Sequence, residues 1–524
     1  MECSRPGCFL IPHRNNLAKV WNLRKVRSRA MPDRPNVVIV MTDQQRADVS
    51  AREGFPLDTT PFLDGLAQQG AWFDRAYTAA PVCAPARVSL LTGRFPSAHR
   101  VRENRGCQYA TYTQDLIDVA RSQGYATAMV GKNHSHLTPK RVDHWFPLSH
   151  NGGFGENRTT QEKAFDQWMA ELNHGVGIEP TPFPVECQGP YRAVSDAQAW
   201  IRSLGGRPFF LWLTFAEPHN PFQVPEPYFS RFPPETLPPL RAGKEALAAK
   251  GFKWQWTRRL GEHVYLNYDE LIPRARANYF GMLRFIDDQL RRFVECLDAQ
   301  RLLPNTLLVF VSDHGDFVGE YGLMRKGPEM PEALMRIPLF FVGPGVTSRP
   351  EPHPTHVSIV DILPTLCEAL GVPLPPGVQG RSLWSLLTGS DYPPEEFASV
   401  YAEQGYGGLH YTDDDRPDFA HCLIPGPKGP TFDELNTYSQ SGTMRMLRRG
   451  GWKLVFDMQG RGQLFRLSSD PAELDNLFDR PEHAAVRSQL LADLLAWTLR
   501  AQDPLPLPKD KYIFKTDPRN YWAR

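Results

Sequence analysis

The chain has 524 residues, with 59 Lys and Arg against 58 Asp and Glu and a formal net charge of +1. Hydrophobic residues make up 41% of it, which is typical of a soluble protein with one large domain and a smaller one. The balanced charge gives no reason to expect a nucleic-acid partner. The longest apolar runs, 208–215 and 306–311, are shorter than the roughly 20 residues of a membrane helix. We expect neither nucleic acid nor membrane as a partner.

Residues 1–30 are rich in Lys and Arg and contain no apolar stretch of the length found in secretory signals. We predict that they form a disordered basic tail, with a transit peptide as the alternative. The eight cysteines form no CxxC pair, so neither a zinc framework nor a disulfide scaffold is indicated. This cysteine usage favours a reducing compartment, and we predict a cytoplasmic protein.

From Pro35 to about Gly345 one pattern repeats, in which a short apolar run stops at polar residues and a loop or helix follows. Amphipathic stretches such as TPFLDGLAQQG separate these runs. The alternation predicts an α/β fold with a large, mainly parallel sheet flanked by helices on both faces. Four of the runs end in polar side chains, in chain order Asp43 and Gln44, Lys132 and His134, His219, and Asp313 and His314.

These side chains should converge, because ligands bind outside the carboxyl ends of the strands in such sheets. A single strand-end Asp or His usually has a structural role, and only the combination indicates a site. Asp43, Gln44, Asp313 and His314 offer carboxylate, amide and imidazole ligands, a set that suits Ca²⁺, Mg²⁺ or Mn²⁺ better than structural zinc. The cations that we place beside the metal, where they would bind a sulfate or phosphate ester, are Arg87, Lys132 and Lys326.

The segment AAPVCAPARVSLLTGR, residues 79–94, places Cys83 four residues before Arg87. Pro85 suits a first helical turn and an apolar run follows, so we expect Cys83 to open a helix. The N-terminus of that helix would point at the anion and attract it through the helix dipole. The alternative is an inert, buried cysteine.

The run CAPAR with its Leu-Thr-Gly-Arg extension resembles the Cys-x-Pro-x-Arg signature of type I sulfatases in the alkaline phosphatase superfamily. The resemblance extends from about Pro35 to Leu477. It implies an alkaline phosphatase-like fold and oxidation of Cys83 to formylglycine, whose aldehyde hydrates to a diol. It also implies a formylglycine-generating enzyme as maturation partner, one divalent metal (Ca²⁺, or Mn²⁺ or Mg²⁺) and a small-molecule sulfate ester as substrate.

By the same resemblance, Asp43, Gln44, Asp313 and His314 are the metal ligands, with Cys83 at the ion. The elements GKNH and EPHNPF match those that supply the family's catalytic lysine and histidines, and Asn104 resembles a substrate-contacting residue. The implied catalytic residues are Cys83, Arg87, Lys132, His134, His219 and Lys326, and the implied substrate contacts are Asn104, Lys132, His219 and Lys326.

In this scheme the metal and Arg87 keep one diol hydroxyl ionised, with Asp313 as its base. His219, helped by Lys326, protonates the leaving alcohol, and His134 is the base that triggers release of sulfate. Lys132 and Lys326 neutralise the equatorial oxygens.

Two alternatives stay open. Gln44 and His314 also occur in the phosphonate monoester hydrolase branch of the superfamily, so a phosphonate monoester or phosphodiester hydrolase on the same scaffold is the first. The second is a non-catalytic oxyanion-binding protein with an unmodified Cys83.

We predict a catalytic domain at residues 31–390 and a small C-terminal domain at 391–505, with an antiparallel sheet and a packed helix. Residues 506–524 form a tail, which we predict to be a frayed end, with docking on a neighbouring subunit of a homo-oligomer as the alternative. The segment 357–383 is predicted to be one helix followed by a proline turn. Loops at 146–188 and 221–268 should build the pocket wall with His150, Trp168, Trp254 and Trp256.

Overall fold

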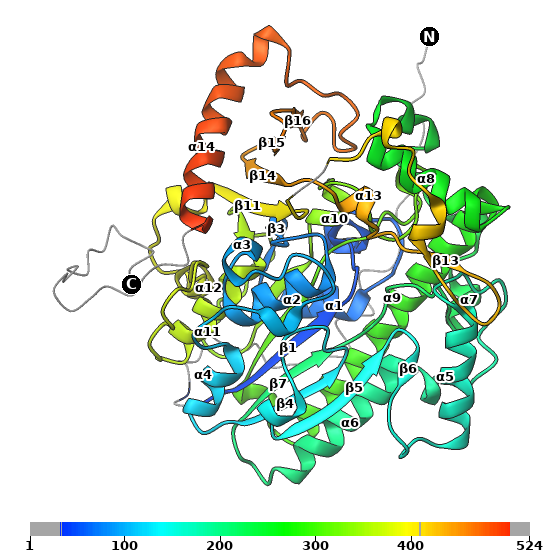
Figure 1. Cartoon of the computed structure of the whole chain (residues 1–524). Coiled ribbons are helices and arrows are strands. Elements are labelled where there is room, and N and C mark those ends of the chain that lie inside the picture. Colours follow the sequence, from blue (N-terminus) through cyan, green and yellow to red (C-terminus); the bar gives the residue numbers. More distant parts are fainter. Residues whose placement is uncertain (1–31, 33, 408–409, 503–524) are drawn as a thin grey trace, which may run out of the picture.

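The computed structural model describes residue 32 and residues 34–407 and 410–502, so the predicted tails at 1–30 and 506–524 lie outside the described residues (Figure 1). An eight-stranded sheet with the order β2-β9-β8-β1-β7-β4-β5-β6 forms its centre. These strands are β1 (Asn36–Thr42), β2 (Ala71–Phe73), β4 (Ala126–Gly131), β5 (His144–Ser149), β6 (Gly152–Gly153), β7 (Phe209–Thr214), β8 (Thr306–Ser312) and β9 (Leu339–Val342).

The five strands from β8 to β5 run parallel, and the mainly parallel sheet predicted from the sequence is confirmed. Antiparallel pairs of β9 with β8, β2 with β9, and β6 with β5 complete both edges. β1 is buried along its whole length, because helices cover both faces of the sheet. Its side chains alternate between two apolar clusters, with Ile39 in one and Val38 in the other.

The first cluster joins one face of the sheet to α2 (Cys83–Thr92), α4 (Leu116–Ser122) and α11 (Ile362–Ala369). The second joins the other face to α1 (Pro61–Ala67), α6 (Gly189–Ser203) and α9 (Tyr268–Ala299). Helices on both faces are therefore confirmed. The single helix predicted for the segment 357–383 is wrong at its start, because β10 (Val357–Ser358) and a 3₁₀ turn precede α11.

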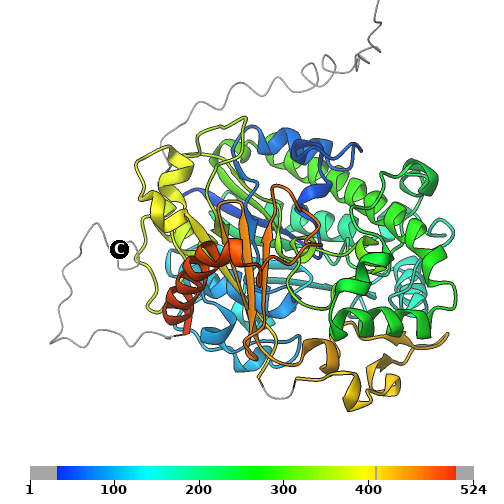
Figure 2. The ribbon, with the colours of Figure 1, turned by 90° about the horizontal axis from the view of Figure 1, so that it is seen from above.

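A four-stranded antiparallel sheet follows in the C-terminal part, with the order β11-β14-β15-β16. Its strands are β11 (Ser399–Gln404), β14 (Met444–Arg449), β15 (Trp452–Asp457) and β16 (Gly462–Arg466). The long helix α14 (Ala484–Gln502) packs on this sheet (Figure 2), and Trp497 Nε1 donates to Ser399 Oγ over 2.8 Å. The predicted small antiparallel sheet with its helix is confirmed.

The segment between β11 and β14 packs elsewhere, against α8 (Phe252–Val264) of the larger part. Phe419 stacks on Trp256 with ring centroids 4.7 Å apart. Trp256 and Trp254 are both buried in apolar clusters, and Trp168 packs on Phe165 and Phe183. All three tryptophans therefore pack in apolar clusters, and the assignment of the pocket wall to the segments 146–188 and 221–268 stays a prediction.

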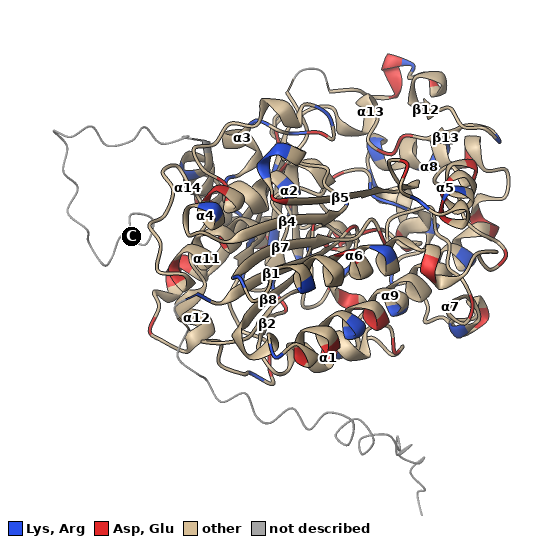
Figure 3. Ribbon diagram, turned by 90° about the horizontal axis from the view of Figure 1, so that it is seen from below, with Lys and Arg blue, Asp and Glu red and all other residues tan. Residues whose placement is uncertain are grey.

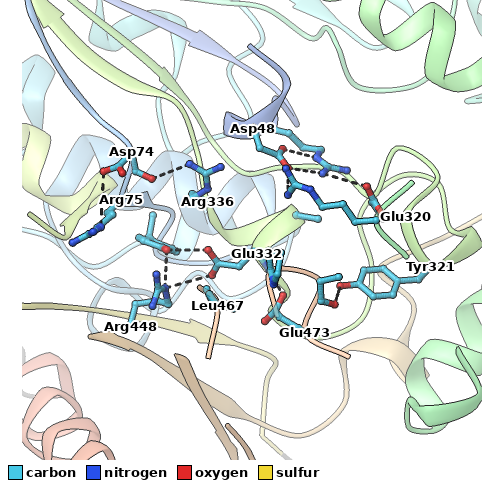
Figure 4. A pocket seen from close by; sticks show the side chains of 16 residues that line it. Asp48, Asp74, Arg75, Glu320, Tyr321, Glu332, Arg336, Arg448, Leu467 and Glu473 are labelled. Carbon is cyan, nitrogen blue, oxygen red and sulfur yellow. Dashed lines mark hydrogen bonds and ion pairs between the residues drawn. The ribbon is translucent and has the colours of Figure 1, made fainter. Parts of the chain in front are cut away.

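A charged cavity of about 220 Å³, here called the Glu332 cavity, lies between the larger part and the C-terminal sheet (Figure 4). Five arginines and five carboxylates are among its lining residues, namely Arg46, Arg75, Arg241, Arg336, Arg448, Asp48, Asp74, Glu320, Glu332 and Glu473. Most form ion pairs, such as Arg46 with Asp48 at 2.7 Å. Glu332 also accepts a hydrogen bond from the Tyr77 hydroxyl over 2.9 Å.

Lys and Arg are interspersed with Asp and Glu along the ribbon in Figure 3, rather than gathered into one basic stripe. Within the described part of the chain, no helix combines the length and the apolar character needed to cross a bilayer.

Candidate active site

Side chains from the carboxyl ends of four neighbouring parallel strands meet in one buried cluster. Thr214 ends β7, Asp43 and Asp313 follow β1 and β8, and Lys132 follows β4. Arg87 on α2 binds all four of these residues. The structure thus brings together residues that the sequence separates by more than 200 positions, because parallel strands end at the same edge of the sheet.

Cys83 is the first residue of α2, as the sequence predicts, and is fully buried. The preceding Val82 has an extended backbone and no capping side chain, so the amide groups of the first turn lack the usual side-chain cap. Ala84 N donates instead to Asn104 Oδ1 over 3.1 Å. At the other end Gly93, with a φ of 63°, closes the helix in the left-handed conformation that glycine adopts without strain. This helix fixes the sulfur at the edge of the carboxylate cluster.

The Cys83 site, as we call this cluster, contains a group of side chains that fits a metal ion. One ligand atom from each of Asp43, Cys83, Asp313 and His314 lies within 4.8 Å of all the others, and all four residues are 0% exposed. Cys83 Sγ lies 3.2 Å from His314 Nε2 and 3.6 Å from Asp43 Oδ1. His314 Nδ1 lies 2.8 Å from the Gly315 carbonyl, so it donates there and leaves Nε2 as a ligand facing the cluster.

Arg87 orients the two carboxylates of the cluster. Its Nε donates to Asp313 Oδ2 over 2.9 Å, and its Nη2 donates to Asp43 Oδ2 over 3.1 Å. Lys132 Nζ donates to the same Asp43 Oδ2. The Oδ1 atoms are left on the side of His314, whose Nε2 lies 3.9 Å from each of them. Two carboxylates held in this way present hard oxygen ligands to one point.

The charges around Cys83 shift its acidity. Burial and the Asp43 carboxylate oppose ionisation, but Lys132, Lys326 and His314 outweigh them and lower the pKa of the Cys83 thiol to about 5. Burial also disfavours the charged form of Arg87, yet Asp313 and Asp43 raise its pKa above the ordinary value. The protein around position 83 therefore stabilises negative charge.

Gln44 stands between this cluster and a second group of polar side chains. Its backbone has a φ of 63°, and with its amide nitrogen toward Asp316 Oδ2 (2.6 Å) the amide oxygen lies 2.9 Å from Lys326 Nζ. The same oxygen lies 3.1 Å from His219 Nε2. Gln44 thereby links the carboxylate cluster to the Lys326 and His219 pair.

Lys326 is fully enclosed by polar partners. Its Nζ lies 3.0 Å from His219 Nε2 and 3.0 Å from Glu434 Oε1. Burial disfavours the charge of Glu434, but Lys326 and Arg325 lower its pKa to about 2, so Glu434 is an anion at neutral pH. Burial, His150 and Lys326 together hold the pKa of His219 well below its usual range, and its ring is neutral.

The remaining predicted residues lie at the rim of the cluster. His134 Nε2 is 3.2 Å from the Asn104 carbonyl, and Asn104 in turn contacts the first turn of α2. His150 contacts Lys132 and His219 directly. The sequence prediction does not include Thr214, Glu434 or His174, although the position of Thr214 at the end of a parallel strand was a usable signal.

Comparison with known proteins agrees with this geometry. The family model described as Sulfatase matches residues 35–372. The arylsulfatase of Clostridium perfringens (strain 13 / Type A) is 28% identical over 482 residues, 86% of this chain and 91% of that protein. The choline-sulfatase of Rhizobium meliloti (strain 1021) is 28% identical over 502 residues, 90% of this chain and 88% of that protein.

Solved structures show the same fold. The phosphonate monoester hydrolase of Agrobacterium radiobacter has a TM-score of 0.71 at 23% identity, over 89% of this chain and 96% of that one. A putative sulfatase of Bacteroides thetaiotaomicron has a TM-score of 0.65 at 19% identity, over 93% and 96%. The alkaline phosphatase-like fold implied by the sequence is confirmed. The family model covers well over half of the chain, so this protein belongs to the sulfatase family and is a sulfatase.

Proposed function

We propose that this sulfatase hydrolyses a small-molecule sulfate ester through a formylglycine made from Cys83, with one divalent cation held by Asp43, Gln44, Asp313 and His314. The observation that carries the proposal is the position of Cys83 Sγ, which lies 3.2 Å from His314 Nε2 and 3.6 Å from Asp43 Oδ1 at the start of α2. Arg87, Lys132 and Lys326 surround it as buried cations. Such a set suits an ester with a tetrahedral, anionic head.

The donor set fits a divalent cation with hard ligands. The carboxylates of Asp43 and Asp313 face His314 Nε2, and Asp313 and Cys83 overcome burial to raise the pKa of His314 to about 9. A divalent cation at this place would neutralise the negative charges that raise the pKa of His314. Ca²⁺, Mn²⁺ or Mg²⁺ would supply Lewis-acid stabilisation of charge on oxygen.

The surrounding side chains support the steps of an ester hydrolysis. If Cys83 is converted to an aldehyde, the hydrate would supply an oxygen nucleophile that bonds to sulfur and displaces the alcohol. Loss of a proton from the second hydroxyl would then re-form the aldehyde and expel sulfate by C–O cleavage. Arg87 stabilises negative charge on the nucleophilic oxygen, and Asp313 is the base for it. Lys132 and Lys326 bind the equatorial oxygens of the ester, and Asn104 contacts the substrate beside them.

Two further groups move protons in this proposal. The pair of Lys326 and His219 protonates the leaving alcohol, supported by the 3.0 Å separation of their nitrogens. His134, which reaches the first turn of α2 through Asn104, is the base for the release of sulfate.

The proposed partner for maturation is a formylglycine-generating enzyme. Six cysteines in the described ranges are free, which supports a reducing compartment, and we propose a cytoplasmic protein without nucleic-acid or membrane partners. We keep 31–390 and 391–505 as the proposed domains, and a homo-oligomer as the proposed assembly.

The test compares aryl sulfates with aryl phosphonate monoesters that carry the same leaving groups, and measures the mass of the peptide around Cys83. We expect the mass to show the CH₂SH side chain replaced by CHO, and kcat/KM to be higher for the sulfates. Higher kcat/KM for the phosphonates would overturn the substrate class. An unmodified, fully active Cys83 would overturn the formylglycine route.

A further inference from the structure

His150 lies at the tip of a tight hairpin between β5 and β6. Ser149 pairs with Gly152 across it, so His150 and Asn151 form a two-residue turn. Gly152 has a φ of 90°, and a Cβ there would meet Asp166 Oδ1 at 1.8 Å. Only glycine fits this position without a clash. The hairpin therefore holds His150 in one place at the edge of the Cys83 site.

His150 contacts two groups to which the proposed reaction assigns roles. Its Nε2 lies 2.8 Å from Lys132 Nζ. Its ring stacks on that of His219, with centroids 3.7 Å apart and an angle of 24° between the planes. The His174 ring lies near both, with centroids 5.7 Å and 5.9 Å away. Among the described histidines, His150 therefore has the ring centroid nearest to that of His219.

The chemistry of His150 suits it to hold both neighbours. Burial and the Lys132 charge keep the pKa of His150 well below its usual range, so the ring is neutral and Nε2 accepts a hydrogen bond. The face of the His150 ring also packs directly on the face of the His219 ring. The result is two lysine and histidine pairs side by side, Lys132 with His150 and Lys326 with His219.

We propose that His150 is a positioning residue of the active site, which fixes the Lys132 ammonium by accepting its hydrogen bond and fixes the His219 ring by stacking. This inference rests on the proposed function, because the two neighbours are those that bind the ester oxygens and deliver the leaving-group proton. The two contacts are separable, since one uses Nε2 and the other uses the face of the ring.

Two variants separate these contacts. His150→Phe keeps a flat ring against His219 but cannot accept from Lys132. His150→Gln keeps an acceptor but has no ring. His144→Gln is the matched control, because His144 begins β5, the strand that leads to His150, but pairs with Asp196 and stacks on Trp200, away from the cluster. Each protein is assayed with aryl sulfates of graded leaving-group pKa, and its melting temperature is recorded.

For His150→Gln we expect the loss in kcat to grow by about 10-fold from the best to the poorest leaving group, because proton delivery matters most for poor leaving groups. For His150→Phe we expect a similar loss in kcat/KM for every ester, because Lys132 contacts the sulfate head in all of them. His144→Gln should match the wild type. A uniform loss in His150→Gln, or wild-type kinetics in both variants, would overturn the proposal. If His150→Gln does not fold, His150→Ala, which also lacks the ring, supplies the slope against leaving-group pKa.

Failure of the proposed function gives a different result. If the wild type turns over only aryl phosphonates, the substrate class is wrong, and the same comparison on phosphonates of graded leaving-group pKa decides the role of His150. The slope against leaving-group pKa is the readout that a merely structural role would leave unchanged.

Discussion

The Cys83 site and the Glu332 cavity are both rich in paired charges, and yet they are chemically different. In the cavity, arginines face carboxylates in ion pairs, and no histidine or cysteine is among the described residues that line it. In the Cys83 site, a thiol, imidazoles and lysines lie among the carboxylates. Arginine holds its proton at any ordinary pH, whereas imidazole exchanges one near neutrality.

The difference teaches that buried charge alone does not make an active site. Ion pairs in the cavity join the C-terminal strands to the larger part, as Arg448 does with Glu332 at 3.7 Å. The Cys83 site adds groups that can donate an electron pair or move a proton. Each region also has a glutamate paired with a buried lysine: Glu434 with Lys326 in the Cys83 site, and Glu473 of the cavity lining with Lys453 behind it. These two pairs make a matched comparison possible.

The largest expected effect is that of Cys83→Ala. Removal of the nucleophilic position should lower kcat/KM by at least about 10³-fold. The side chain at this position is small, so the free energy of unfolding should fall by only about 1 kcal/mol. Steady-state kinetics and chemical denaturation measure the two. Activity within tenfold of wild type would show that Cys83 is not the nucleophilic position.

Removal of divalent cations should come next. A chelator should abolish activity, and Ca²⁺, Mn²⁺ or Mg²⁺ should restore it. Because a cation that binds only the folded state stabilises it, by about 2.7 kcal/mol at 100 times its Kd, the melting temperature should rise with added cation. Asp313→Asn should lose this rise, while a substitution in the Glu332 cavity should keep it. A melting temperature that changes with neither chelator nor added cation would contradict the metal site.

Glu434→Gln should have a smaller effect. It removes the counter-charge 3.0 Å from Lys326 and leaves a hydrogen-bonding side chain of the same shape. We expect kcat to fall by about 10-fold with KM nearly unchanged, since a displaced lysine weakens proton delivery to the leaving group. An unchanged kcat would show that Glu434 does not contribute to catalysis.

Glu473→Gln should have the smallest effect on catalysis. Glu473 lies 2.7 Å from Lys453, which is fully buried, so the free energy of unfolding should fall by about 3 kcal/mol. We expect kcat within twofold of wild type at a temperature where the variant is folded. A kcat loss equal to that of Glu434→Gln would mean that the two regions are coupled and that the comparison fails.

Much of the site was predictable because its signals are local in sequence. Asp43 and Asp313 each follow an apolar run, and parallel strands bring such ends together whatever lies between them. Cys83 and Arg87 lie one helical turn apart, so a single helix start presents both to the same place. The alternating apolar runs likewise determined the main sheet and its two covered faces.

Other residues gave no such signal. Glu434 reaches Lys326 from 108 positions further along the chain, in a segment that packs on α8 rather than on the C-terminal sheet. Trp254 and Trp256 lie in a segment predicted to form the pocket wall. Both rings are buried in apolar clusters, because burial of a large apolar ring stabilises the fold.

The sequence by itself determined which chemical groups stand at the strand ends and at the start of α2, because the spacing of residues along a strand or helix fixes where their side chains point. Only the tertiary structure decided which lysine meets which histidine. The stacking of His150 on His219, and the contact of Lys326 with Glu434, depend on how distant loops pack around one point. Packing depends on shape and burial over the whole molecule, and no local pattern records it.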